Sequence, residues 1–192
     1  LKGPQGHARV NAAFYGAEGL IVHRCRVEGG SLSVGEQVTA SVEADRRQAI
    51  RRAHTATHLL HHALREVLGS HAAQSGSLVA PDLLRFDFSH HQALSAEELR
   101  QVEALVNAKV LADAPVTARM SGLEEAKAAG AIALFGEKYG DQVRAVGVGD
   151  FSTELCAGTH LSRTGEIGLF RIVEQESVGA GLRRLTAVTG EG

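Results

Sequence analysis

The 192-residue sequence has little cysteine, a single methionine, no long apolar run and no excess of positive charge. Its two cysteines, Cys25 and Cys156, are too few for a disulfide framework, so we expect both thiols to be reduced. No stretch of about 18 apolar residues could span a bilayer, and the first residues lack the basic-then-apolar pattern of a secretory signal. These absences argue against a disulfide-rich secreted protein and favour a cytoplasmic one with no membrane partner.

The charge balance limits the kind of nucleic-acid binding that the chain could perform. Twenty Lys and Arg residues against 22 Asp and Glu give a formal net charge of −2, which argues against coating nucleic acid by bulk electrostatics. Any contact with RNA must therefore come from a local group of basic side chains. The chain begins at Leu1 and its only methionine is Met120, so we interpret it as a piece of a longer polypeptide.

Hydrophobic periodicity divides the chain into a β-rich beginning and a longer mixed part. Up to about residue 45, glycine-bearing turns separate short β-branched runs at 20–22 and 37–42. The apolar spacing then becomes helical and predicts a helix of about 20 residues that ends at Gly69. Capping boxes that begin at Ser95 and Ser121 predict two further helices.

Strands are predicted among these helices where apolar residues alternate or gather between glycine-bearing turns. They are expected at 84–88, 131–135, 143–148, 167–173 and 182–188. This order of elements predicts an α+β fold, with a small β subdomain over residues 1–45 and a two-layer domain over residues 46–192.

Histidine is unusually common, and several of the ten histidines gather in one helical segment. At about 100° per residue, His54, His58 and His61 share a face that is distinct from the apolar stripe and is predicted to point away from the core. Two imidazoles one turn apart can bind one metal ion. His58 and His62 have the same spacing as His54 and His58, and chance alone gives about 0.5 such pairs. Exposed histidines explain the pattern more simply, so spacing alone does not select the ligands.

A second pair, Cys156 and His160, has the same separation in a polar, glycine-bearing stretch. Chance gives only about 0.1 such pairs, which makes this one more informative. The alternative is a buried cysteine that packs as a small apolar residue beside a surface histidine. Together the two pairs offer three nitrogens and one thiolate, a donor set that suits tetrahedral zinc better than magnesium or calcium.

Longer sequence segments around these residues resemble the editing domain of alanyl-tRNA synthetase. These segments are residues 54–60, 74–79, 84–90, 134–139, 151–160 and 163–171. The likeness extends in order over roughly residues 29–192. It implies a partial β-barrel over residues 1–45, an editing domain over residues 46–192, and one zinc ion. The ligands that it implies are His54, His58, Cys156 and His160.

The resemblance also implies an activity. In this family the domain hydrolyses the ester of serine or glycine wrongly attached to alanine tRNA. A synthetic site built for a methyl side chain cannot reject the smaller glycine, and it excludes serine only imperfectly. We therefore expect an aminoacyl-tRNA deacylase that acts on mischarged alanine tRNA, in cis with the rest of a synthetase. No aminoacylation domain is present, so neither alanine activation nor ATP use is expected.

By the same resemblance, Gln74 and Thr57 line the pocket near the aminoacyl group. Our hypothesis is that the Thr57 hydroxyl hydrogen-bonds the hydroxyl of serine, and the alternative is that Thr57 only packs beside the apolar stripe. Zinc could polarise the ester carbonyl, activate a water or hold the substrate in register. The sequence does not choose among these roles. Four protein ligands close a tetrahedral site, so catalysis by a metal-bound water requires a fifth position or a ligand that moves away.

Contact with RNA is expected from basic side chains, because these neutralise phosphate. Arg183 and Arg184 are the leading residues, and the alternative for them is a solvated strand face. The further candidates are Arg51, Arg52, Lys138 and Arg163.

Two departures from the family pattern stand out. Ala157 occupies a position that is usually glycine, and residues 1–28 lack the full glycine-rich segment of the family's β-barrel. One alternative is the editing domain of threonyl-tRNA synthetase, which usually has proline where Thr159 stands and lacks the segment that stands at 84–88. The other alternative is a zinc-stabilised tRNA-binding module without catalysis.

Overall fold

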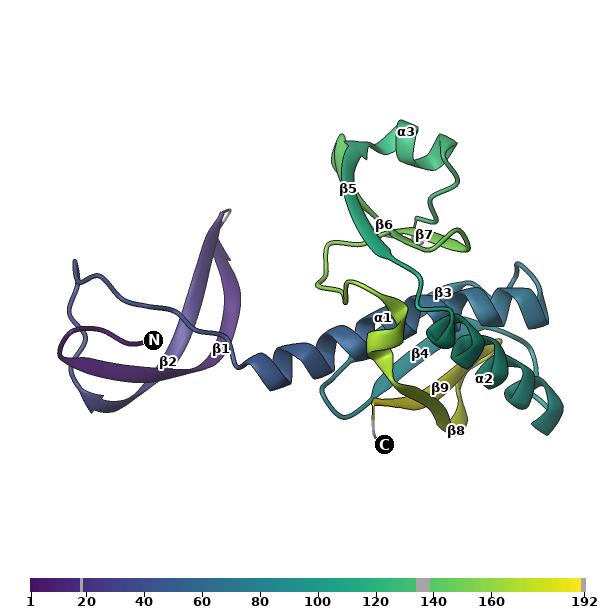
Figure 1. Ribbon diagram of the computed structural model, residues 1–192, viewed down its shortest axis with the longest axis horizontal. Helices are drawn as coiled ribbons and strands as arrows, with labels where there is room; N and C mark the ends of the chain where they lie inside the picture. The colour runs from purple at the N-terminus through teal and green to yellow at the C-terminus, as the bar shows by residue number, and fades with distance from the viewer. Residues whose placement is uncertain (18, 134–138, 191–192) are drawn as a thin grey trace. The chain divides into compact units, whose positions relative to one another are not determined.

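The computed structural model describes residues 1–17, 19–133 and 139–190, and it divides into two compact units, Leu1–Glu43 and Ala44–Gly192 (Figure 1). The first unit is an antiparallel pair of strands, β1 (Gly6–Ala17) and β2 (Leu20–Gly30), and it is not a closed barrel.

The predicted strand at 37–42 is wrong. Only Thr39 pairs there, in an isolated bridge with Lys2. Val38 and Val42 are exposed, so no buried apolar face holds this run against a partner strand.

Helix α1 (Ala44–Leu68) begins the second unit and is longer than expected, at 25 residues. Its end at Gly69 is confirmed: the residue has a φ of 104°, and its N–H donates to the carbonyl of Arg65 at 3.0 Å. A left-handed φ of this kind favours glycine, which is why the helix ends where the sequence predicted.

The two predicted capping boxes had different outcomes. Helix α2 (Ala96–Leu111) begins with the expected box, in which the Ser95 hydroxyl accepts from the N–H of Glu98 and the Glu98 carboxylate accepts from the N–H of Ser95. The box at Ser121 is wrong, because Ser121 pairs with Val143 in a sheet and the short helix α3 (Leu123–Ala128) starts after Gly122 without a side-chain cap.

Two antiparallel sheets complete the second unit, and the α+β fold is confirmed. The four-stranded sheet has the order β3-β4-β9-β8, and the three-stranded sheet has the order β5-β6-β7. The bounds are β3 Gln74–Val79, β4 Leu84–Ser89, β5 Val116–Gly122, β6 Gln142–Val148, β7 Ser152–Leu155, β8 Leu169–Gly179 and β9 Leu182–Gly190.

The strands predicted at 84–88, 143–148 and 182–188 are confirmed. The strand expected at 167–173 starts later, because a 3-10 turn over Thr164–Ile167 and Gly168, with a φ of 72°, precede it. Of the strand expected at 131–135, residues 134–135 lie outside the described residues, and Ile132 forms only an isolated bridge with Glu154.

The main core lies where α1 and α2 cover one face of the four-stranded sheet. The sheet contributes Phe86, Phe88 and Leu185, all fully buried, because alternate residues of each strand point to this face. A smaller cluster joins α3 to the three-stranded sheet, which lies next to it in Figure 1. One side of helix α1 packs in the main core, and another side contacts β7.

Candidate metal centre

Two segments far apart in the sequence bring four metal-binding side chains together. Helix α1 carries His54 and His58 one turn apart, and the loop after β7 carries Cys156 and His160. One donor atom from each of the four lies within 4.8 Å of the others. Nε2 of both His54 and His160 lies 3.4 Å from Sγ of Cys156. His62 is not in the group and pairs instead with Glu66, at 3.1 Å from Nε2 to Oε2.

The histidines of α1 were predicted to be exposed on a face away from the apolar stripe, and the predicted exposure is wrong. His58 is 3% exposed and His61 is 1% exposed. Strand β7 and the following loop cover this face, where the Thr55 hydroxyl accepts from the N–H of Leu161 at 3.1 Å. The apolar stripe showed which side of the helix meets the main core. It could not show that a second layer covers another side.

Contacts outside the cluster orient each imidazole. Nδ1 of His160 lies 3.2 Å from the Thr55 hydroxyl, and the ring of His54 donates a hydrogen bond to the backbone of Thr159. Nδ1 of His58 lies 3.3 Å from the Glu154 carboxylate, within ion-pair distance but not aligned as a hydrogen bond. With Nδ1 directed outward in this way, Nε2 is the nitrogen left to bind a metal, an arrangement common in metal sites.

Burial keeps the three imidazoles neutral. Desolvation, with the nearby ring of His58, lowers the pKa of His54 to about 4 and the pKa of His160 to about 2. Desolvation also lowers the pKa of His58. Neutral imidazole is the form that binds a metal, so the site does not need to lose protons from these rings near pH 7.

Two of the distances between donor atoms match those of a tetrahedral zinc site. Tetrahedral zinc with bonds of about 2.0–2.3 Å separates its donor atoms by roughly 3.3–3.8 Å. The two sulfur–nitrogen distances of 3.4 Å fall within this range. Three nitrogens and one sulfur are also donors that suit zinc better than they suit magnesium or calcium.

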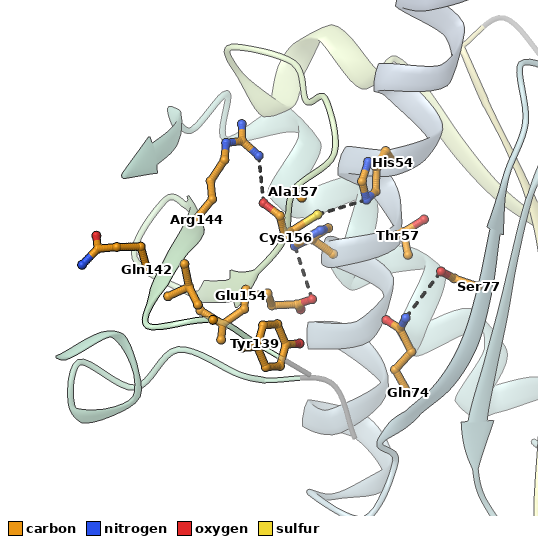
Figure 2. Close-up of a pocket in the computed structure, with 14 residues that line it drawn as sticks. His54, Thr57, Gln74, Ser77, Tyr139, Gln142, Arg144, Glu154, Cys156 and Ala157 are labelled. Atoms are coloured by element: carbon orange, nitrogen blue, oxygen red, sulfur yellow. Dashed lines mark hydrogen bonds and ion pairs between the residues drawn. The ribbon is translucent and has the colours of Figure 1, made fainter. Parts of the chain in front are cut away.

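A cavity of about 480 Å³ opens beside the cluster. Thr57, Gln74 and Ser77 line one side, and Gln142 and Arg144 line the other (Figure 2). The structure thus places Thr57 and Gln74 in the same cavity as His54, His58 and Cys156. The Thr57 hydroxyl donates to the carbonyl of Ala53 at 2.9 Å.

Arg144 holds the loop that carries the cysteine. Its Nη1 donates to the carbonyl of Cys156 at 2.9 Å and to that of Gly158 at 2.7 Å. A side chain at Gly158 would put Cβ 2.1 Å from the His54 ring, so glycine is required there. Ala157 is exposed, which explains why alanine is accepted at that departure from the family pattern.

Glu154 and Arg144 belong to the site but were not predicted, and His61 was predicted only as a member of the histidine face. Glu154 precedes Cys156 by two residues at the end of β7, and this spacing places both on one face of an extended segment. That spacing could have drawn attention to Glu154. Nothing in the sequence marked Arg144.

The basic residues predicted to contact RNA differ in what already binds them. Arg184 makes a bidentate ion pair with Asp87, at 2.6 and 2.8 Å, and Arg163 lies 2.6 Å from Asp113. Arg183 forms no ion pair among the described residues, nor do Arg51 and Arg52, and the buried Nε of each lacks a hydrogen-bond partner there. Lys138 lies outside the described residues.

The described part of the chain has no helix with both the length and the apolar character needed to cross a membrane.

Comparison with known proteins places the chain beside one group of enzymes. Residues 143–186 match the family "Threonyl and Alanyl tRNA synthetase second additional domain". The chain is 57% identical to an alanine–tRNA ligase of Halorhodospira halophila over 88% of its own length and 20% of the relative. It is 53% identical to that of Desulforamulus reducens over 100% of its own length and 22% of the relative. The chain thus spans about a fifth of these relatives, and the resemblance to alanyl-tRNA synthetase is confirmed.

Proposed function

From its similarity to a segment of alanine–tRNA ligases, we propose that this chain hydrolyses the ester of serine or glycine mischarged on alanine tRNA. The observation that carries the proposal is one cavity lined both by three members of the four-donor cluster, His54, His58 and Cys156, and by the side chains of Thr57 and Gln74. A cavity of about 480 Å³ is large enough for an aminoacyl group together with part of the terminal ribose.

Selection against alanine would come from Thr57. Because its hydroxyl proton already donates to the carbonyl of Ala53, the oxygen is left to accept a hydrogen bond. The hydroxyl of a seryl group can donate that bond. The methyl group of an alanyl ester cannot, so the correct product gains less from the cavity.

The hydrolytic water would be placed by Gln74. Its amide nitrogen donates to the hydroxyl of Ser77 at 3.4 Å, which turns the side chain so that its carbonyl oxygen can accept from a water. Zinc held by His54, His58, Cys156 and His160 would supply positive charge that binds and polarises the substrate's reacting end. Four protein ligands favour this role over activation of a metal-bound water.

Two groups of basic side chains would contact the RNA with different strength. Arg183, Arg51 and Arg52 pair with no carboxylate in the part of the chain that the structure describes, so phosphate would meet them directly. Arg184 and Arg163 must first exchange a carboxylate for a phosphate, so we assign them smaller contributions. Lys138 stays a candidate from the sequence. Mischarged alanine tRNA would be the partner, with the rest of a cytoplasmic synthetase in cis.

The test is to incubate the zinc-loaded chain with serine-charged and alanine-charged alanine tRNA and to measure the release of each amino acid. Release of serine without release of alanine supports the proposal. Tight binding without release would point instead to a zinc-stabilised tRNA-binding module. Preferential action on serine-charged threonine tRNA would point to the threonyl type of editing domain.

A further inference from the structure

We propose that Glu154 is a positioning residue of the metal centre, which holds the imidazole of His58 and balances the charge of the bound ion. The inference rests on the proposed metal site and concerns a side chain outside the four ligands. It starts from the fact that Glu154 is a carboxylate with only 4% of its surface exposed, next to the donors His58 and Cys156.

Both oxygens of Glu154 face imidazoles of α1. Oε1 lies 3.0 Å from Nδ1 of His61, and Oε2 lies 3.3 Å from Nδ1 of His58. The Ser152 hydroxyl lies 3.4 Å from Oε1 and donates to it. Nδ1 of His58 has no hydrogen-bond partner among the described residues, and the Glu154 carboxylate lies within ion-pair distance of it. A small turn of the ring would convert this contact into a hydrogen bond that holds the ligand.

His61 holds the carboxylate from the other side. Its ring packs against Phe86 in the main core, with centroids 5.4 Å apart, and it is 1% exposed. A row of contacts thus runs from the core through His61 and Glu154 to the ligand His58. Carboxylates that bind the outer nitrogen of a ligand histidine fix the ring and raise its basicity in other metal sites.

Charge balance gives Glu154 a second role. A divalent ion bound by one thiolate and three neutral imidazoles carries a net charge of about +1. An unbalanced charge is costly in a buried site. The carboxylate of Glu154, beside His58, supplies the missing negative charge without entering the ligand set.

A role as general base is the alternative, because Glu154 also lines the cavity. Its geometry argues against this role, since each oxygen is directed at an imidazole and the side chain is 5% exposed. A base must reach the water from which it removes a proton. Glu154 is better placed to hold His58 than to meet substrate.

The experiment measures zinc affinity of the whole chain by competition with a chromogenic chelator. Glu154→Gln retains an acceptor oxygen but removes the charge, and we expect it to bind zinc 10- to 100-fold more weakly. Cobalt(II) bound in place of zinc should show an altered visible spectrum, which reports a change in ligand geometry rather than in folding. Glu124→Gln is the matched control, because this exposed carboxylate lies on α3, where it pairs with Lys127. It should bind zinc like the unchanged chain.

The outcomes separate this inference from the proposed function. If the unchanged chain binds no zinc, the proposed metal site fails. If the unchanged chain binds zinc and Glu154→Gln binds it within twofold, the positioning role is overturned, and a fall in kcat alone would then assign Glu154 as a base. If Glu154→Gln does not fold, Glu154→Asp decides: it keeps the charge but is too short to reach both imidazoles, and undiminished zinc affinity would overturn the role.

Discussion

Helix α1 is buried on two sides, and different interactions bury each. One side carries Ala56, Leu60 and Leu64, which are fully buried in the apolar core with the four-stranded sheet and α2. The other side carries His58 and His61, which are almost as inaccessible but meet the carboxylate of Glu154. The comparison shows that burial alone does not distinguish a structural side of a helix from a functional one.

The two sides should also respond differently to change. Apolar burial stabilises in proportion to area and needs no particular partner. A buried polar side chain needs specific partners, because the folded protein is destabilised when one of those partners is removed. Changes on the apolar side should therefore lower stability, whereas changes on the polar side should lower metal binding and activity.

The largest effect is expected when a ligand on the polar side is removed. Cys156→Ala deletes the only thiol of the cluster, and zinc content should fall from about one ion per chain to nearly none. Release of serine from mischarged tRNA should fall at least about 100-fold. Metal analysis and deacylation assays measure both quantities. Cys25→Ala, at an exposed thiol in the first unit, is the control and should retain both. Full zinc content in Cys156→Ala would remove this residue from the ligand set.

A change on the apolar side should lower stability instead. Leu60 is fully buried, so Leu60→Ala should lower the free energy of unfolding by about 2–5 kcal/mol. The loss should be the same with and without zinc, because Leu60 lies among the core residues and not in the cluster. Denaturant unfolding measures it, and Leu111→Ala, at a residue 85% exposed, should change it by less than about 0.5 kcal/mol. If zinc abolished the loss, the two sides of α1 would not be independent.

Lowering the pH should decrease the free energy of unfolding of the metal-free chain, because of the histidines on the polar side of α1. The unfolded chain binds protons at His54 and His160 below their ordinary pKa of 6.5, whereas the folded chain resists protonation down to about 4 and about 2. Unfolding therefore takes up protons, and stability should fall as the pH drops from 6.5 towards 4. The slope is up to about 1.4 kcal/mol per pH unit for each histidine. Denaturant unfolding at several pH values tests this, and His54→Gln should have a shallower slope. An equal slope in that variant would contradict the assignment.

The smallest effect is expected for substrate choice. Thr57→Val removes the hydroxyl but keeps the shape, so kcat/KM should fall about 10-fold for serine-charged alanine tRNA. Glycine-charged tRNA is the matched control and should react as before, because glycine has no side-chain hydroxyl. Thr57→Ser should retain the serine reaction. An unchanged serine reaction in Thr57→Val would exclude the proposed hydrogen bond.

Local features were predicted well and long-range ones were not. The end of α1 at Gly69 and the start of α2 at Ser95 depend on a few adjacent residues, so the sequence could indicate them. The box at Ser121 failed because pairing with Val143 across a sheet outweighed the local capping pattern. The ion pair between Arg184 and Asp87 could not be anticipated either, because these residues are 97 positions apart and meet only when their strands pair.

The amino-acid sequence by itself determined the supply of donors, namely two histidines one turn apart on a helix and a cysteine–histidine pair in a loop. Only the tertiary structure decided that these donors meet and that the histidine face of α1 is buried. Only it showed that Glu154, 93 positions from His61, lies between His61 and His58. The physical reason is that helical periodicity and capping act within a few residues, whereas burial and pairing depend on which distant strand packs against the helix.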